Sequence, residues 1–214
     1  MPLGEPPTYD VATLERKAAE FLRTRFGQDV PIPVDVDLLL EQTAGVDLDV
    51  WPALRDNHGL EGMICRDAAS GELIVYIDEW LADNRPTRYR MTVAEELAHV
   101  LLHRTVIEQI DSPAGFQELQ KHPRWFEMDR NAKRFAAAIL MPGEQVTREA
   151  GQVYSKLVRA ASFGDAAAIN KYLAAQLAKQ FEVSPQAMTF RLREWPMKIE
   201  DRVDQAMRAQ LDYL

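Results

Sequence analysis

Hydrophobic residues recur along this chain with two different spacings, one typical of strands and one typical of helices. Val46, Leu48 and Val50 alternate with aspartates, and two short hydrophobic runs follow at 62–66 and 73–78. A period of two, and short runs bounded by turn residues, are typical of strands. The pattern therefore predicts a small antiparallel sheet of about three strands.

Almost all of the remaining sequence has the spacing of amphipathic helices. Asp10 and Asp35 are suited to cap two early helices, which Gly27 and Gly45 would end. From about residue 87 onward, the hydrophobic positions recur every three or four residues. Further helices are expected at 87–103, 130–140, 144–160, 166–181, 185–195 and 199–213. The predicted fold class is therefore α+β and predominantly helical.

Composition narrows the classes of protein to which this chain can belong. Its 214 residues, 47% of them hydrophobic, are enough for one compact unit with a sizeable core. With 33 acidic residues against 25 basic ones and a net charge of -8, the whole molecule lacks the basic character of nucleic-acid-binding proteins. The single cysteine, Cys65, excludes an internal disulfide, as expected in a reducing compartment. No hydrophobic run is long enough to span a membrane and no signal peptide begins the chain, so we expect a cytoplasmic protein without a membrane partner.

One pentapeptide in the helical part has the spacing of a metal site. Zinc peptidases of the H-E-x-x-H class place two ligands four residues apart, because that spacing brings both side chains to one face of a helix. The glutamate between them serves as the general base. In this chain the corresponding residues run from Glu95 and Glu96 to His99, so a carboxylate stands at the first ligand position. On its own this pattern is weak, since glutamate and histidine often lie four residues apart on helices.

The surrounding residues give the pentapeptide more meaning. The stretches RYRMTVAEELAHVLLH (88–103) and DRNAKRFAAAILMP (129–142) resemble the ImmA/IrrE family of metallo-endopeptidases. Typical patterns of that family are R-F-T-x-A-H-E-L-G-H-x-L-L-H and E-x-x-A-N-x-F-A-A-x-L-L-M-P. The second pattern matches at Ala132, Phe135, Ala136, Ala137, Leu140, Met141 and Pro142. The order of elements is also similar, over most of residues 10–195.

The resemblance implies a zincin-like fold and a role for four residues. Glu95, His99 and Asp129 take the positions of the metal ligands, and Glu96 that of the catalytic base. Two of these positions depart from the family pattern, since Glu95 replaces a histidine and Asp129 replaces a glutamate. Two carboxylates and one imidazole make a harder and less electrophilic site, so the expected ion is one divalent Zn or Mn. A site that binds metal weakly, or not at all, is the alternative.

Each of these residues also has a structural interpretation. Glu95 could pair with Arg88 or Arg90, and Glu96 could likewise be solvated. His103 lies too far along the helix to share an ion with Glu95 and is expected to be a histidine stabilised at the helix C-terminus.

The second helix leaves similar alternatives open. Asp129 could cap that helix, and Glu127 would then be the substitute ligand. We expect His58 and His122, which lie beside glycine or proline, to face solvent.

Residues 171–195 predict two helices joined by a tight turn, which is also the arrangement of a DNA-binding helix-turn-helix. Gln186, Thr189, Arg191 and Arg193 are the residues that could contact DNA. The alternative is that the pair simply packs into the protein, since four basic residues make a weak phosphate-binding surface.

We therefore expect a metallopeptidase-like domain at 1–160 and a C-terminal helical segment at 161–214 packed on the same unit. The resemblance implies a regulatory endopeptidase that acts on a protein partner, such as a helix-turn-helix repressor, in a stress or mobile-element switch. One alternative is a degenerate member that binds a protein without hydrolysis, or serves as a toxin-antitoxin component. The other is a DNA-binding regulator that uses residues 171–195.

Overall fold

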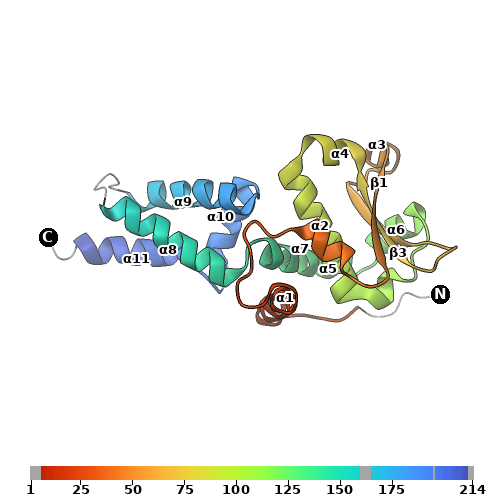
Figure 1. The fold of residues 1–214 in the computed structure, drawn as a ribbon, viewed down its shortest axis with the longest axis horizontal. Coiled ribbons are helices and arrows are strands. Elements are labelled where there is room, and N and C mark those ends of the chain that lie inside the picture. Colours follow the sequence, from red (N-terminus) through yellow and green to blue (C-terminus); the bar gives the residue numbers. More distant parts are fainter. Residues whose placement is uncertain (1–5, 160–164, 195, 212–214) are drawn as a thin grey trace. The chain divides into compact units, whose positions relative to one another are not determined.

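The computed structural model describes residues 6–159, 165–194 and 196–211. Helices dominate it, and a single small sheet is formed by three strands of the described residues (Figure 1). The α+β, predominantly helical class is confirmed. By its internal contacts the chain divides into two compact units, 1–18 with 35–140 and 19–34 with 141–214, and helix α1 (Val11–Phe26) contributes residues to both.

The sheet is mixed and not antiparallel throughout. Strands β1 (Val46–Trp51), β2 (Gly62–Arg66) and β3 (Leu73–Asp78) lie in the order β1-β3-β2. β2 and β3 pair antiparallel, but β1 pairs parallel with β3, so the expectation of an antiparallel sheet is wrong in this respect. Helix α3 (Leu54–His58) carries the chain from β1 to the far edge, and the β2–β3 hairpin then places β3 in the middle. A period of two identifies strands, but it does not determine which strands pair.

Two long helices form the centre of the first unit. α5 (Pro86–Ile107) and α7 (Trp125–Leu140) pack against each other, and α5 also lies against β2 and β3 (Figure 1). α5 continues past its expected end, with a kink at His103, whose φ is -129°. The shorter helices of this unit are α2 (Val36–Glu41), α4 (Glu79–Asn84) and α6 (Pro113–Gln120). The α5–α7 pair is the framework on which the predicted metal ligands stand.

The second unit is helical in its described part. It contains α8 (Gly143–Arg159), α9 (Ala166–Phe181), α10 (Pro185–Arg193) and α11 (Ile199–Leu211). Ser184 caps α10 by accepting a hydrogen bond from the N–H of Ala187, as expected for a serine before a first-turn proline. Three of the expected helix ends, at Ala160, Trp195 and Tyr213, lie outside the described residues.

The division into units falls after Leu140. The boundary that we expected after residue 160 stays a prediction, because nothing here tests whether residues 1–160 fold by themselves.

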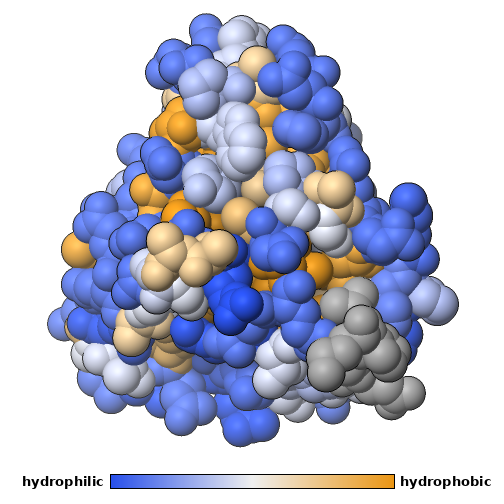
Figure 2. All heavy atoms as spheres, turned by 90° about the vertical axis from the view of Figure 1, so that its right-hand side faces the viewer, coloured by the Kyte–Doolittle hydropathy of each residue, from blue (hydrophilic) through white to orange (hydrophobic). Residues whose placement is uncertain are grey.

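Each helix in the described ranges is too short or too polar to cross a lipid bilayer. Hydrophilic side chains cover most of the face in Figure 2, and hydrophobic ones show in small separate areas between them. That face agrees with a composition in which 27% of residues are charged.

Candidate functional site

A cleft of about 300 Å³ in the first unit contains all four of the predicted site residues. Its walls come mainly from α5, from the N-terminal half of α7 and from the start of β2. Positive, negative and aromatic side chains share these walls. The lining includes Arg55, Glu61, Gly62, Arg88, Glu95, Glu96, His99, Phe116, Trp125, Asp129 and Lys133.

The start of β2 lies unusually close to α5. A Cβ atom added to Gly62 would lie 2.6 Å from Cγ2 of Thr92 and 2.9 Å from Oε1 of Glu96. Both distances are shorter than real Cβ contacts, so only glycine allows this approach. The Glu96 carboxyl group therefore lies against the backbone of Gly62, in space that a side chain at position 62 would need.

Glu96 is a buried carboxyl group that lacks a partner at one oxygen. Its side chain is 7% exposed, and among the described residues nothing hydrogen-bonds to Oε2. Burial raises the pKa of Glu96 to about 8, and the nearby charges of Glu95 and Asp129 add to the rise. The solvated alternative is therefore wrong for Glu96, which is mostly protonated at neutral pH.

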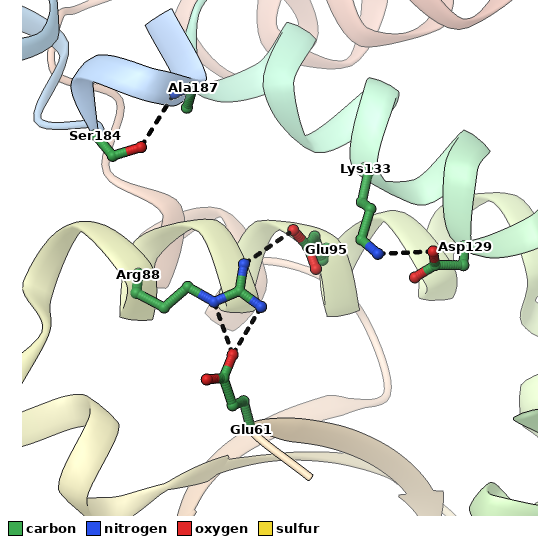
Figure 3. A network of polar contacts seen from close by, with 7 residues as sticks. All are labelled: Glu61, Arg88, Glu95, Asp129, Lys133, Ser184 and Ala187. Atoms are coloured by element: carbon green, nitrogen blue, oxygen red, sulfur yellow. Dashed lines mark hydrogen bonds and ion pairs between the residues drawn. The ribbon is translucent and has the colours of Figure 1, made fainter. Parts of the chain in front are cut away.

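Glu95 lies beside a cation from its own helix. Nη1 of Arg88 is 3.7 Å from Oε1 of Glu95, and the same guanidinium lies 2.7 Å from Oε2 of Glu61 (Figure 3). Burial raises the pKa of Glu95, while the charges of Arg88 and Lys133 oppose the rise. The structural alternative for Glu95, an ion pair with Arg88, is thus the arrangement that the structure has.

Asp129 also lies beside a cation. It occupies the second turn of α7, because that helix begins at Trp125, so the expectation that it could cap the helix is wrong. Its Oδ2 accepts a hydrogen bond from Nζ of Lys133 at 2.7 Å (Figure 3). Glu127 pairs with Arg124 at 3.1 Å and does not line the cleft, so it is no substitute ligand.

His99 is held between two aromatic rings. Its imidazole stacks on the indole of Trp125 at 5.3 Å between ring centroids, and its Nδ1 lies 3.2 Å from Nδ1 of His103. Burial is the main cause that lowers the pKa of His99 to about 3 and that of His103 to about 4. Both rings are therefore neutral, and the Nδ1–H of one ring must donate a hydrogen bond to the Nδ1 of the other. His103 lies at the kink of α5 and not at its last turn, and its fully buried ring is neutral, so the helix C-terminus does not stabilise it as a charged group would be.

The donor atoms of the predicted ligands do not converge on one point. Within the described residues, no three histidine, cysteine, aspartate or glutamate side chains are arranged to hold a metal ion. Glu95, His99 and Asp129 face one cleft, as their spacing predicted, but Arg88 and Lys133 pair with the two carboxylates, while His103 contacts only Nδ1 of His99. A divalent ion does not fit this arrangement, which is a set of ion pairs and stacked rings.

Sequence reasoning missed most of the lining of the cleft, including Lys133 and Trp125. Position 133 offered a signal, because the family pattern has asparagine where this chain has lysine. Trp125 lay in a stretch that was expected to be a loop, so its place beside His99 could not be foreseen.

The C-terminal helix pair presents few basic groups. Arg191 is 2% exposed and donates through Nε to the carbonyl of Met141 at 2.9 Å, so the prediction that it contacts DNA is wrong. Arg193 is paired with Glu200 at 2.7 Å, and Thr189 donates to the carbonyl of Pro185. Gln186 is exposed and stays a prediction as a contact.

Comparison with known proteins connects this cleft to a family. Among curated proteins, none matches the chain. The sequence pattern of a peptidase family described as the IrrE N-terminal-like domain matches residues 70–193, which include α5, α7 and the whole E-E-x-x-H segment. Since the match covers more than half of the sequence, the chain belongs to the family of the IrrE N-terminal-like domain.

Proposed function

We propose that this chain is a regulatory member of its family that binds a polypeptide segment of a protein partner in the cleft and does not cleave it by metal-dependent hydrolysis. The observation that carries the proposal is the state of the three candidate ligands. Glu95 and Asp129 are paired with Arg88 and Lys133, two cations that line the cleft, and Nδ1 of His99 lies against His103. Hydrolysis by the family mechanism needs the same groups to converge on a metal.

The strand edge would offer a partner only a short contact. β2 is an edge strand, and Arg66 donates its N–H outward to Ile110 at 2.6 Å, so Ile64 and Gly62 direct their backbone groups to the same side. Ile64 is fully buried, which leaves Gly62 as the accessible outward-facing residue at the cleft. An added strand of the kind seen in peptide recognition would therefore pair with β2 only at its beginning.

Side chains would supply the rest of the contact. Phe116 and Trp125 provide an apolar wall, and Arg55 and Glu61 provide opposite charges at the rim. Such a mixture of aromatic and charged groups is typical of protein interfaces and unlike the basic surface that nucleic acid requires.

The partner in this proposal is a helix-turn-helix repressor or a similar regulator in the cytoplasm. This part rests on the family resemblance, in which such domains act in stress and mobile-element switches. A toxin-antitoxin pairing would use the same cleft in the same way.

The metal-dependent endopeptidase is the second candidate, and one observation favours it. Glu96 stands at the family position of the general base, and its unpartnered oxygen lies in a buried part of the cleft. For this candidate, Arg88 and Lys133 would have to release Glu95 and Asp129, and each step would cost the ion pair that now exists.

A displayed library of random twelve-residue peptides provides the probe for binding. Peptides enriched on the protein should lose at least fivefold in affinity when Arg55→Ala removes a cleft cation. They should be unaffected by Arg66→Ala, an exposed arginine that does not line the cleft. Equal losses in both variants, or no enrichment, would overturn the binding proposal.

The same peptides separate the two candidates. After incubation with zinc or manganese, mass spectrometry should find them intact. Cleavage that Glu96→Gln abolishes would establish the endopeptidase instead.

A further inference from the structure

Lys133 lies in the cleft that the three candidate ligand positions share. Its ammonium group bonds directly to Asp129 at 2.7 Å. Burial is the main influence on the pKa of Glu95 and of His99, but the charge of Lys133 also acts on both. Lys133 therefore places a positive charge at one ligand position and in the same cleft as the other two.

Two differences from the family pattern compensate each other in charge. At position 95 a neutral histidine is replaced by an anionic glutamate, and at position 133 a neutral asparagine is replaced by a cationic lysine. Both side chains line the same cleft, on α5 and α7, the two helices that pack against each other. The negative charge added by Glu95 and the positive charge added by Lys133 therefore lie in the same cleft and offset each other.

We propose that the ammonium group of Lys133 takes the place of a metal ion, holding Asp129 by a direct bond and Glu95 by charge, so that the cleft keeps its shape without metal. Arg88 supports the arrangement from the other side, because it contacts both Glu95 and Glu61 (Figure 3). A divalent ion entering the cleft would meet a resident positive charge and an occupied carboxylate. The role of Lys133 is structural and electrostatic.

This inference deepens the proposed function and rests on it only for the absence of hydrolysis. It is tested by metal binding and not by partner binding, so the two proposals can fail separately.

Restoring the family's ligands with and without Lys133 tests the inference. A triple variant, Glu95→His with Asp129→Glu and Lys133→Asn, should bind one zinc ion in titration calorimetry after treatment with EDTA. The double variant that keeps Lys133 should bind zinc at least tenfold more weakly. Equal zinc affinity of the double and triple variants would overturn the inference.

Matched controls separate charge from a general effect of mutation. Lys133→Arg in the restored-ligand background keeps the positive charge and should bind zinc as weakly as the double variant. Lys121→Asn removes another lysine that pairs with a carboxylate, Glu118 at 2.9 Å on α6, and should leave zinc affinity unchanged. A gain in zinc affinity from Lys121→Asn equal to that from Lys133→Asn would contradict a specific role for Lys133.

A single substitution keeps the inference testable if the restored variants do not fold. Lys133→Asn alone leaves Asp129 without its bonded cation, so its melting temperature at neutral pH should fall by more than that of Lys121→Asn, whose ion pair is more exposed. Equal melting temperatures of these two variants would count against the proposed role.

Discussion

Glu96 makes stability depend on pH in a direction that can be worked out. Its pKa lies at about 8 in the folded protein, against an ordinary value of 4.5. Below pH 4.5 the carboxyl group of Glu96 is protonated in both states, and its contribution to stability is fully present. Between pH 4.5 and 8 the unfolded chain has released this proton while the folded protein still holds it, so the contribution is lost as the pH rises through 8. The loss amounts to about 1.4 kcal/mol for each pH unit within this range.

Glu96→Gln should remove that dependence, since glutamine is neutral at every pH. Urea unfolding should show similar stability of variant and wild type near pH 4.5, and a variant that is more stable by a few kcal/mol at pH 8.5. Glu108→Gln, at an exposed glutamate next to α5, is the control and should show no such gain. If the difference between Glu96→Gln and wild type is the same at both pH values, the buried carboxyl group is not protonated as described.

Gly62 is the other residue whose identity the cleft requires. Gly62→Ala should destabilise the protein by about 1–3 kcal/mol, because the new methyl group would meet Thr92 and the carboxyl group of Glu96. Gly151→Ala in α8 is a matched control, since a Cβ there meets nothing within 4 Å, and it should stabilise by about 0.5–1 kcal/mol. Thermal unfolding of both variants checks this prediction. If Gly62→Ala left the melting temperature unchanged, α5 and β2 could move apart without cost.

At the residue scale, the sequence predicted which side chains share the cleft but not how they are engaged. The i, i+4 spacing of Glu95 and His99 determines that both face one side of α5, and the second motif brings Asp129 to the same cleft. The partners of these side chains come from other turns and other elements, so their positions depend on packing. The only sign of Lys133 in the sequence was that the family pattern has asparagine at this position.

At the scale of elements, Asp78 joins three of them and was not foreseen. It is 2% exposed, ends β3, caps α4 by accepting from Leu81 N–H at 3.1 Å, and accepts from the N–H of Arg55 at the start of α3. Asp78→Ala should cost about 2–4 kcal/mol, because a buried donor and a part-buried donor lose their acceptor. Asp165→Ala removes an exposed cap of α9 with one hydrogen bond and should cost only about 1 kcal/mol. Chemical denaturation compares the two, and equal costs would contradict the joining role of Asp78.

The α10 helix gives a second contrast between a buried and an exposed residue. Arg191→Met should destabilise the protein by about 3 kcal/mol, since it removes the buried donor to Met141, whereas Arg193→Met at a 60% exposed side chain should cost less than about 1 kcal/mol. Denaturation curves measure both.

Neither variant should change DNA binding at low salt, which we expect to be negligible in the wild type. Salt-dependent DNA binding that the two substitutions abolish would favour the DNA-binding regulator after all.

Helices were predicted better than the pairing of strands. Hydrophobic periodicity and caps gave α9 at its observed bounds, because both signals are local. The parallel β1–β3 pair and the continuation of α5 beyond His103 depend on contacts between segments distant in sequence, and no local pattern encodes these.

At the scale of the whole molecule, the chain combines the family's framework with a changed interior of its cleft. The order of elements from β3 through α10 lies within the family match, and α5 and α7 pack together as the two motifs imply. The differences that change the charge or the length of a cleft side chain lie where a metal would bind, at positions 95, 129 and 133. A fold retained around an altered charge arrangement agrees with a change of task from cleavage to binding.

The melting temperature of the EDTA-treated wild type, measured with and without an excess of zinc or manganese, tests this account most directly. A site whose dissociation constant is one hundredth of the free metal concentration would add about 2.7 kcal/mol to the free energy of unfolding. For a chain of this size, that would raise the melting temperature by about 5–10 °C. We predict a change of less than about 1 °C with either ion, because Lys133 and Arg88 already balance the carboxylates. A rise of several degrees with one equivalent of metal bound, lost in His99→Ala, would contradict it.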